Sequence, residues 1–151
     1  MEVTRRRRLL WHAFLILFMA LLLGFPTTLA PHGRAWMAAH VSGLIGSLMV
    51  LAVAMVWNEL QLTGPQRQRA FVGILLGTWA NLLVNIFGAL VNLPGPATQP
   101  GVKAPAWQMA VLVAFASVLV PAVLIAVGTV LHGLRGSGPV VGPPPSERAA
   151  S

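Results

Sequence analysis

The chain has 151 residues, of which 56% are hydrophobic and only 9% are charged, whereas a soluble domain carries about 25% charged residues. The formal net charge of +7 arises from ten Lys and Arg against three acidic residues, and four of the ten are the consecutive arginines at 5–8. This composition excludes an ordinary soluble domain, a disordered chain and a nucleic-acid-binding domain. Cysteine is absent, which excludes disulfides, thiolate metal sites and cysteine nucleophiles.

Four apolar stretches are long enough to cross a bilayer core, for which a helix needs about 20 residues. In chain order they cover about 9–25, 35–57, 71–91 and 107–134. We therefore predict an all-α, polytopic membrane protein whose domain, 1–135, is a four-helix bundle with short loops. An oligomer is expected, because one small bundle has little interior for polar groups. The Pro/Gly/Ser-rich segment 136–151 is expected to be a disordered cytoplasmic tail.

The basic residues indicate how these helices are oriented. With the N-terminus in the cytoplasm, eight of the ten basic residues lie inside and only Arg34 and Lys103 lie outside, as the positive-inside rule requires. We expect a multi-pass protein of a bacterial-type inner membrane with both termini cytoplasmic. The arginine run is also typical of a signal peptide, but the stretch 9–25 is long for one, so a retained span is expected. Trp36, Trp57 and Trp107 stand at span ends, where an interfacial ring is expected.

His40 is an ionisable residue inside the second span, which makes it a functional candidate. Gly43, Leu44 and Ser47 share its helical face. A glycine one turn away leaves space beside the ring, where a flat cofactor or substrate can approach. A histidine that hydrogen-bonds a neighbouring helix explains the same pattern. Small residues four apart, such as Ser42 with Gly46, predict close helix contacts; the other pairs are Gly43 with Ser47 and Gly73 with Gly77.

The third span carries a polar stripe that includes Asn81 and Asn85. Unpaired amides in hydrocarbon cost of order several kcal/mol each, so both must find partners. Helix-to-helix hydrogen bonding explains one Asn well and a long stripe less well. Counting residues from the outer surface places Asn85 in the same layer as His40, in the outer half of the bilayer, with Asn81 one turn deeper.

At these residues the chain resembles a known family. The segment AHVSGLIGSLMVLAVAMVW at 39–57 and the segment GTWANLLVNIFGAL at 77–90 are similar to small four-helix membrane isomerases, the hydroxylaminobenzene mutases and styrene oxide isomerases. The resemblance extends from the first span to LHGLRG at 131–136. The start Gly-Thr-Trp-Ala-Asn, the segment AWQ at 106–108 and LHGLRG look closer to the mutases.

The resemblance implies a homotrimer that holds haem b between its subunits, with His40 as the axial iron ligand. Gly43 and Ser47, on the face of His40, and Trp79, which can pack against the macrocycle or an aromatic substrate, are the other candidate cofactor-binding residues. The chain departs from the epoxide isomerases at three positions. The epoxide isomerases carry an acid, an Asn and a Tyr at the positions of Gly77, Gly46 and Asn85 in this chain. These differences disfavour epoxide chemistry and leave His40 in place as the implied iron ligand.

A ferric haem iron with one His ligand keeps an open position and is a Lewis acid. We therefore predict an isomerase, a mutase, that transfers the hydroxyl group of an aryl hydroxylamine to the ring and gives an aminophenol. This reaction has no net redox change and needs no cosubstrate. Asn81 and Asn85 are the candidate catalytic residues, which hydrogen-bond the migrating oxygen or position the amine.

Three other functions stay open at this point. The same scaffold can isomerise an epoxide to a carbonyl compound. A small membrane cytochrome would use His12 and His132, which share the inner layer, as two iron ligands. A structural or interaction subunit would carry no cofactor and would use its Asn stripe only for helix contacts. No nucleic-acid partner is expected for any of them.

Overall fold

The fold is known from a computed structural model that describes residues 2–30, 33–93 and 103–136. The part of the chain described is helical and contains no strand, which confirms the all-α prediction. Four long helices, each long and apolar enough to cross a membrane, account for most of it. They are α1 (Glu2–Gly24), α3 (Gly33–Val56), α4 (Gly64–Leu90) and α5 (Ala106–Arg135), with a short α2 (Pro26–Leu29) and a 3-10 turn, η1 (Trp57–Glu59).

The helices extend beyond the apolar stretches that predict them. The first begins at Glu2, so the arginine run is helical, because Arg is a good helix former, and Arg6 Nε donates to the carbonyl oxygen of Ala54 on α3 at 3.3 Å. The third stretch is lengthened to Gly64, where Thr63 and Gln66 form a capping box: the Thr63 backbone N–H donates to Gln66 Oε1 at 2.9 Å. Except for Gly136, the segment predicted to be disordered lies outside the described residues.

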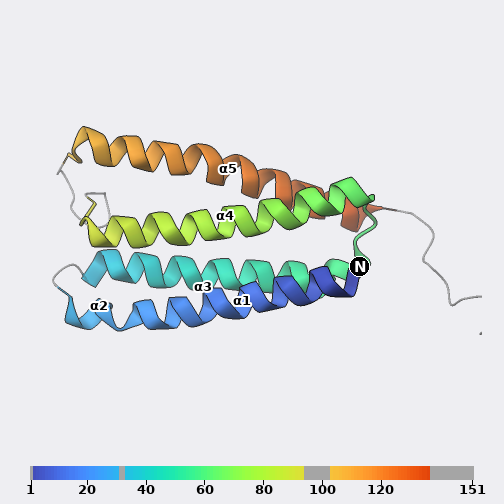
Figure 1. Cartoon of the computed structure of the whole chain (residues 1–151), viewed down its shortest axis with the longest axis horizontal. Coiled ribbons are helices and arrows are strands. Elements are labelled where there is room, and N and C mark those ends of the chain that lie inside the picture. The colour runs from blue at the N-terminus through green and yellow to red at the C-terminus, as the bar shows by residue number, and fades with distance from the viewer. Residues whose placement is uncertain (1, 31–32, 94–102, 137–151) are drawn as a thin grey trace, which may run out of the picture.

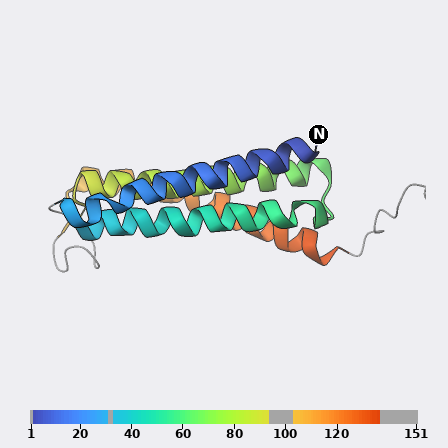
Figure 2. The same cartoon turned by 90° about the horizontal axis from the view of Figure 1, so that it is seen from below.

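The long helices lie side by side in the order α1, α3, α4, α5, with neighbours antiparallel (Figure 1). Figure 2, the view turned by 90°, shows α1 and α3 nearest the viewer and α4 behind them. The apolar core lies among α1, α3 and α4, whereas α5 packs mostly against α4. Only Gln108, Ala126, Val130 and Gly133 of α5 are buried. The four-helix membrane fold is thus confirmed, and the oligomer stays a prediction.

Small residues stand where the helices approach most closely, as predicted. A Cβ atom added at Gly43 would lie 2.7 Å from Ala20 Cβ of α1, and one added at Gly46 would lie 2.8 Å from Thr78 Cγ2 of α4. A Cβ atom at Gly73 would lie 2.9 Å from the carbonyl oxygen of Ala122 on α5. Glycine therefore permits the contacts of α3 with α1 and of α4 with α5.

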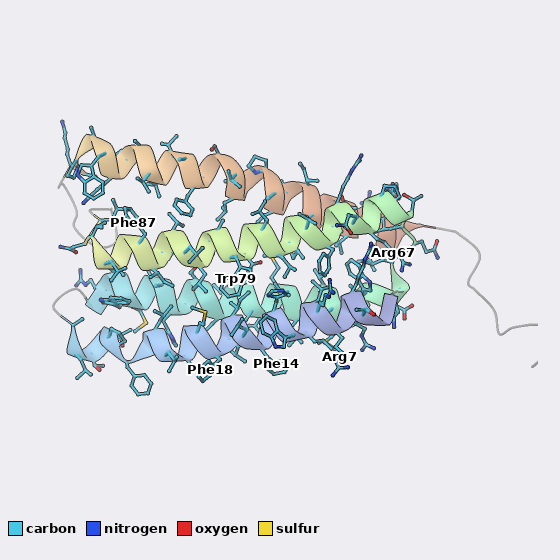
Figure 3. All side chains as sticks on the ribbon, viewed as in Figure 1. Arg7, Phe14, Phe18, Arg67, Trp79 and Phe87 are labelled. Carbon is cyan, nitrogen blue, oxygen red and sulfur yellow. The ribbon has the colours of Figure 1, made fainter. Side chains whose placement is uncertain are left out.

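Basic residues gather at one end of the bundle. The arginines at 5–8 begin α1, Arg67 and Arg69 begin α4, and Arg135 ends α5, so all lie at the end where Figure 3 labels Arg7 and Arg67. Arg34 and Lys103 lie at the opposite end. The basic residues on which the predicted orientation rests are therefore distributed unequally between the two ends of the bundle. Which end faces the cytoplasm stays a prediction, and Arg148 lies outside the described residues.

Trp57 is not an interfacial ring, so this part of the tryptophan prediction is wrong. Its side chain is fully buried, with its ring edge-on to Phe71 at a centroid distance of 6.3 Å. The reason is the turn η1, which begins at Trp57 and turns the chain back toward α4. Trp107 is 53% exposed at the other end, against Phe87.

Candidate functional site

His40 is held by α1. Its Nδ1 lies 2.8 Å from the carbonyl oxygen of Ala20, and its ring lies over Gly24, where an added Cβ would be 3.2 Å from Nδ1. A carbonyl can only accept, so in this hydrogen bond Nδ1 carries the proton and donates. The neutral ring then keeps its lone pair on Nε2. A backbone carbonyl that fixes the tautomer in this way is the usual support of a metal-ligating histidine.

Asn81 and Asn85 of α4 meet a hydroxyl of α3. Both amide nitrogens donate to Ser42 Oγ, at 2.6 Å from Asn81 and 3.1 Å from Asn85. The Asn85 amide also donates to the backbone carbonyl of Asn81 at 2.8 Å. The two half-buried amides are therefore paired, as a position in the hydrocarbon requires. Ser42 is a member of this cluster that sequence reasoning had used only as a small residue at a helix contact.

His40 and the asparagines share a layer but not a side of α3. Ser42 follows His40 by two residues, which is about 3 Å along the axis and about 200° around it. The predicted common layer of His40 and Asn85 agrees with the contact that Asn85 makes with Ser42. Asn81 contacts the same hydroxyl. Within one chain, however, His40 faces α1 while the asparagines face the α3–α4 contact.

A partly open cleft of about 300 Å³ lies where α3 and α5 diverge over α4. Asn81 lines this cleft and Asn85 does not appear in its wall. Thr78 also lines it but is 1% exposed and donates its hydroxyl to the carbonyl of Ile74 in its own helix, at 2.7 Å. The rest of the wall is apolar or glycine: Ile45, Gly46, Met49, Gly77, Leu119, Val120, Val123 and Leu124. The cleft thus offers an apolar space with one amide in it.

Gly43 does not provide the space beside His40 that its position suggests. A side chain there would meet Ala20, and Leu82 Cδ1 would be 3.2 Å from it, so the position is filled from both sides. Ser47 is buried and donates to the carbonyl of Leu44 at 2.8 Å. The reason is that α1 and α4 both pack closely on α3 here. An approach to His40 past Gly43 is therefore closed within the chain.

Trp79 points away from the cleft, toward α1. Its Nε1 donates to His12 Nδ1 at 3.3 Å, and the two rings are nearly perpendicular with centroids 6.1 Å apart. Figure 3 labels Trp79 on the side of α4 that faces α3 and α1. His12 also meets Trp11 edge-on at 4.9 Å. Trp79 therefore connects α4 to α1 in this chain. The sequence does not predict this contact, because Trp79 and His12 are 67 residues apart.

His132 lies in a groove between α4 and α5 with Arg69 and Gln66 of the first turns of α4. His12 contacts Trp79, which is ten residues or about 15 Å further along α4, so the predicted common inner layer of the two histidines is wrong. His12 lies in the contact of α1 with α4 instead. The described residues show no contact that joins the two histidines. Nor do these residues contain a group of three or more His, Cys, Asp or Glu side chains that could hold a metal ion.

Comparison with known proteins adds the family. The family model for styrene oxide isomerase matches residues 5–135. Hydroxylaminobenzene mutase HabB of Ectopseudomonas oleovorans is 28% identical to this chain over 93% of the chain and 92% of its own length. No solved structure matches. The family match includes all four long helices, the Ser42 cluster and the cleft, and the chain therefore belongs to the styrene oxide isomerase family of membrane isomerases.

Proposed function

We propose that this protein is a haem b-dependent mutase that converts an aryl hydroxylamine to an aminophenol by intramolecular hydroxyl transfer. The observation that carries the proposal is Asn81, one amide in an otherwise apolar cleft that is large enough for a small aromatic molecule. The printed name of the mutase relative supports the substrate class. An uncharged aromatic hydroxylamine partitions into lipid and can reach such a cleft from the bilayer.

His40 has the features of a residue that would hold the iron of a haem. Its Nδ1–H is bonded to Ala20 O, which directs the lone pair to Nε2 and orients the ring. When bound, haem iron would supply a Lewis acid that polarises the N–O bond of the substrate. Because His40 and the cleft lie on opposite sides of α3, one chain does not place both around one cofactor. This favours a haem b site between subunits, and the resemblance to the family implies that the oligomer is a homotrimer.

The reaction balances without a cosubstrate. The N–O bond of the hydroxylamine breaks, a C–O bond forms at the ring, and the ring proton that is displaced ends on the nitrogen. In this scheme Asn81 uses its second amide hydrogen or its carbonyl to orient the migrating oxygen. Asn85 bonds Ser42 and the Asn81 backbone, so it positions Asn81 rather than contacting substrate. The apolar wall keeps water away from the reacting nitrogen.

The first test is the absorption spectrum of the detergent-purified protein, expressed with ample haem, before and after addition of phenylhydroxylamine. We expect a Soret band that shifts with substrate, together with formation of aminophenol. A colourless protein that still turns over the substrate would overturn the haem part alone. A haem protein that leaves phenylhydroxylamine unchanged would overturn the substrate part.

Replacement of the ligand sharpens this test. His40→Ala is expected to abolish the Soret band and to lower turnover by at least about a hundredfold, because the cofactor loses its protein ligand. Met55→Ala, exposed on the same helix fifteen residues or about 22 Å from His40, is the matched control and is expected to retain both. Membrane insertion is checked by the amount of protein in the membrane fraction. Full activity in His40→Ala would remove His40 from the site.

Isomerisation of an epoxide to a carbonyl compound is the second candidate, favoured by the description of the matching family. Gly77 and Gly46 line the cleft, at positions where the resemblance to epoxide isomerases implies an acid and an Asn. With glycine there, the cleft lacks those polar groups. We therefore expect turnover of styrene oxide to be slower than turnover of phenylhydroxylamine in the same preparation. Faster turnover of styrene oxide than of phenylhydroxylamine would make epoxide isomerisation the first proposal and the mutase reaction the second.

A further inference from the structure

A second hollow lies between α4 and α5, at the arginine-rich end of the bundle. This α4–α5 groove has a volume of about 460 Å³. The first turns of α4 contribute Gln66 and Arg69, and the last turns of α5 contribute His132. It does not share Asn81 or Thr78 with the cleft described above, although Leu124 borders both.

The polar part of the groove carries one full positive charge, on Arg69, together with His132, Gln66 and Thr129. Arg69 and His132 are both exposed and come from different helices, and no acidic side chain occurs among the described residues that line the groove. The groove lies between the first turns of α4 and the last turns of α5, so the two helix ends contribute partial charges of opposite sign and the net charge comes from Arg69. An anion is therefore favoured here over a cation or a neutral group.

The other part of the groove is apolar and extends along α5 toward the middle of the membrane. Leu124, Gly128 and His132 succeed one another at four-residue steps, so they lie on one face of the helix. Leu124 is 67% exposed, and a Cβ atom added at Gly128 would meet no other atom within 4 Å. The glycine thus leaves an open channel between the apolar residues and the cationic end.

We propose that the α4–α5 groove binds an anionic phospholipid. The phosphodiester lies between Arg69 and His132, and one acyl chain follows the channel over Gly128 to Leu124. The order of chemistry along the groove, cationic at the membrane surface and apolar deeper, matches a lipid and not a free anion, for which the apolar channel has no use. This site is separate from the proposed mutase reaction and does not depend on it.

The experiment measures lipid binding to the full-length protein by native mass spectrometry, with phosphatidylglycerol against phosphatidylcholine. We expect preferential binding of phosphatidylglycerol. Arg69→Gln is expected to weaken it about fivefold, the effect of removing one cation near the membrane surface. His132→Gln is expected to weaken it by less, because it changes the ring beside the phosphate without removing a full charge. Arg34→Gln, at the opposite end of the bundle, is the charge control and is expected to bind as the wild type does.

A charge-neutral variant tests the channel. Gly128→Leu fills open space and is expected to weaken phosphatidylglycerol binding, whereas Ala116→Leu, exposed elsewhere on α5, is not. If Arg34→Gln and Arg69→Gln weakened phosphatidylglycerol binding equally, the lipid would be attracted by surface charge in general. That result would overturn the proposal. If millimolar inorganic phosphate competed with the lipid and Gly128→Leu had no effect, the groove would be a site for a free anion. That result would overturn the proposal that it binds a phospholipid. Unchanged binding in all the groove variants would also overturn it.

Discussion

At the scale of single residues, the polar groups of this membrane chain are placed by the bonds that they must make. His40 bonds a carbonyl of α1, and Ser42, two residues on, accepts from two amides of α4. Each hydrogen bond gives a polar group a partner inside the protein, because no water is available in a bilayer core. The same bonds also leave specific atoms available: Nε2 of His40, and the part of the Asn81 amide that lines the cleft.

The two asparagines are expected to differ in their effect on turnover. Asn81→Ala removes the amide that lines the cleft and is expected to lower kcat about a hundredfold or more, as loss of a hydrogen bond to developing charge does. Asn85→Ala removes a positioning contact and is expected to lower kcat about tenfold. Both should keep the Soret band. Leu83→Ala, exposed on the same helix, is the control.

The measurement is kcat for phenylhydroxylamine together with the haem spectrum of each variant. A larger loss in Asn85→Ala than in Asn81→Ala would reverse their roles. Loss of the Soret band in either would move that asparagine from the reaction to cofactor binding or to the structure of the bundle.

The hydroxyl of Ser42 is expected to matter for stability. Ser42→Ala leaves two amide donors without their acceptor and is expected to cost about 1–3 kcal/mol. Ser47→Ala is the matched control, because its hydroxyl bonds the carbonyl of Leu44 within its own helix, an interaction that adds little to helix stability. Thermal unfolding in detergent measures both. Equal shifts of Tm in the two variants would contradict the role given to Ser42.

At the scale of the helices, glycine decides which pairs approach closely. The chain places Gly43 against α1, Gly46 against α4, and Gly73 of α4 against α5. Helix association in lipid depends on such close packing, because burial of apolar surface gives no driving force there. The amount of packing differs among the helices: α3 and α4 bury one face against each other and a second against α1 or α5.

Gly43→Ala tests this packing next to His40. The new Cβ would lie 2.7 Å from Ala20 Cβ and 3.3 Å from Ala20 Cα, so α1 must move away. Overpacking of this kind is expected to cost about 1–3 kcal/mol, and it shifts the carbonyl that holds His40, so haem affinity should fall as well. Gly128→Ala is the control: with open space around it, this change is expected to be neutral or stabilising by up to about 1 kcal/mol.

Thermal unfolding and haem titration of the two variants are the measurements. If Gly43→Ala unfolded at the same temperature as Gly128→Ala, the close approach of α1 and α3 at this level would not exist. A lower Tm with unchanged haem affinity would separate packing from ligand support.

At the scale of the whole molecule, charge and topology agree. An even number of membrane-spanning helices places both chain ends on one side, and seven arginines of the described residues lie at that end: those at 5–8, Arg67, Arg69 and Arg135. The α3–α4 turn with Glu59 lies at the same end, and Lys103 lies before α5 at the other. We therefore expect the arginine-rich end to face the cytoplasm, as the positive-inside rule predicts.

Because the chain contains no cysteine, single introduced cysteines report the orientation directly. Lys103→Cys is expected to react with a membrane-impermeant maleimide on intact cells. Glu59→Cys is expected to react only after the membrane is permeabilised. Both positions are exposed, so access to reagent is limited by the membrane alone. The reverse pattern of labelling would invert the topology.

Periodicity, length and composition were enough to predict the four long helices. Each apolar stretch makes all its backbone hydrogen bonds within its own helix, so it needs no partner segment. The exact ends were less predictable, since capping at Thr63 and helical arginines before residue 9 depend on polar residues outside the apolar stretches. The buried Trp57 was missed for a related reason: a ring at a span end can turn toward lipid headgroups or toward the core, and the turn after it decides.

Residue types and local spacing alone predict the class of protein, the four spans, the charge asymmetry and the candidate residues His40, Asn81 and Asn85. How these residues are combined depends on contacts between helices. Hydrogen bonds between helices set His40 against α1 and the asparagines against Ser42, and close contacts at Gly43 filled the space expected beside the ring. Which face of a helix meets which neighbour depends on packing across the whole bundle, and no local pattern contains that information.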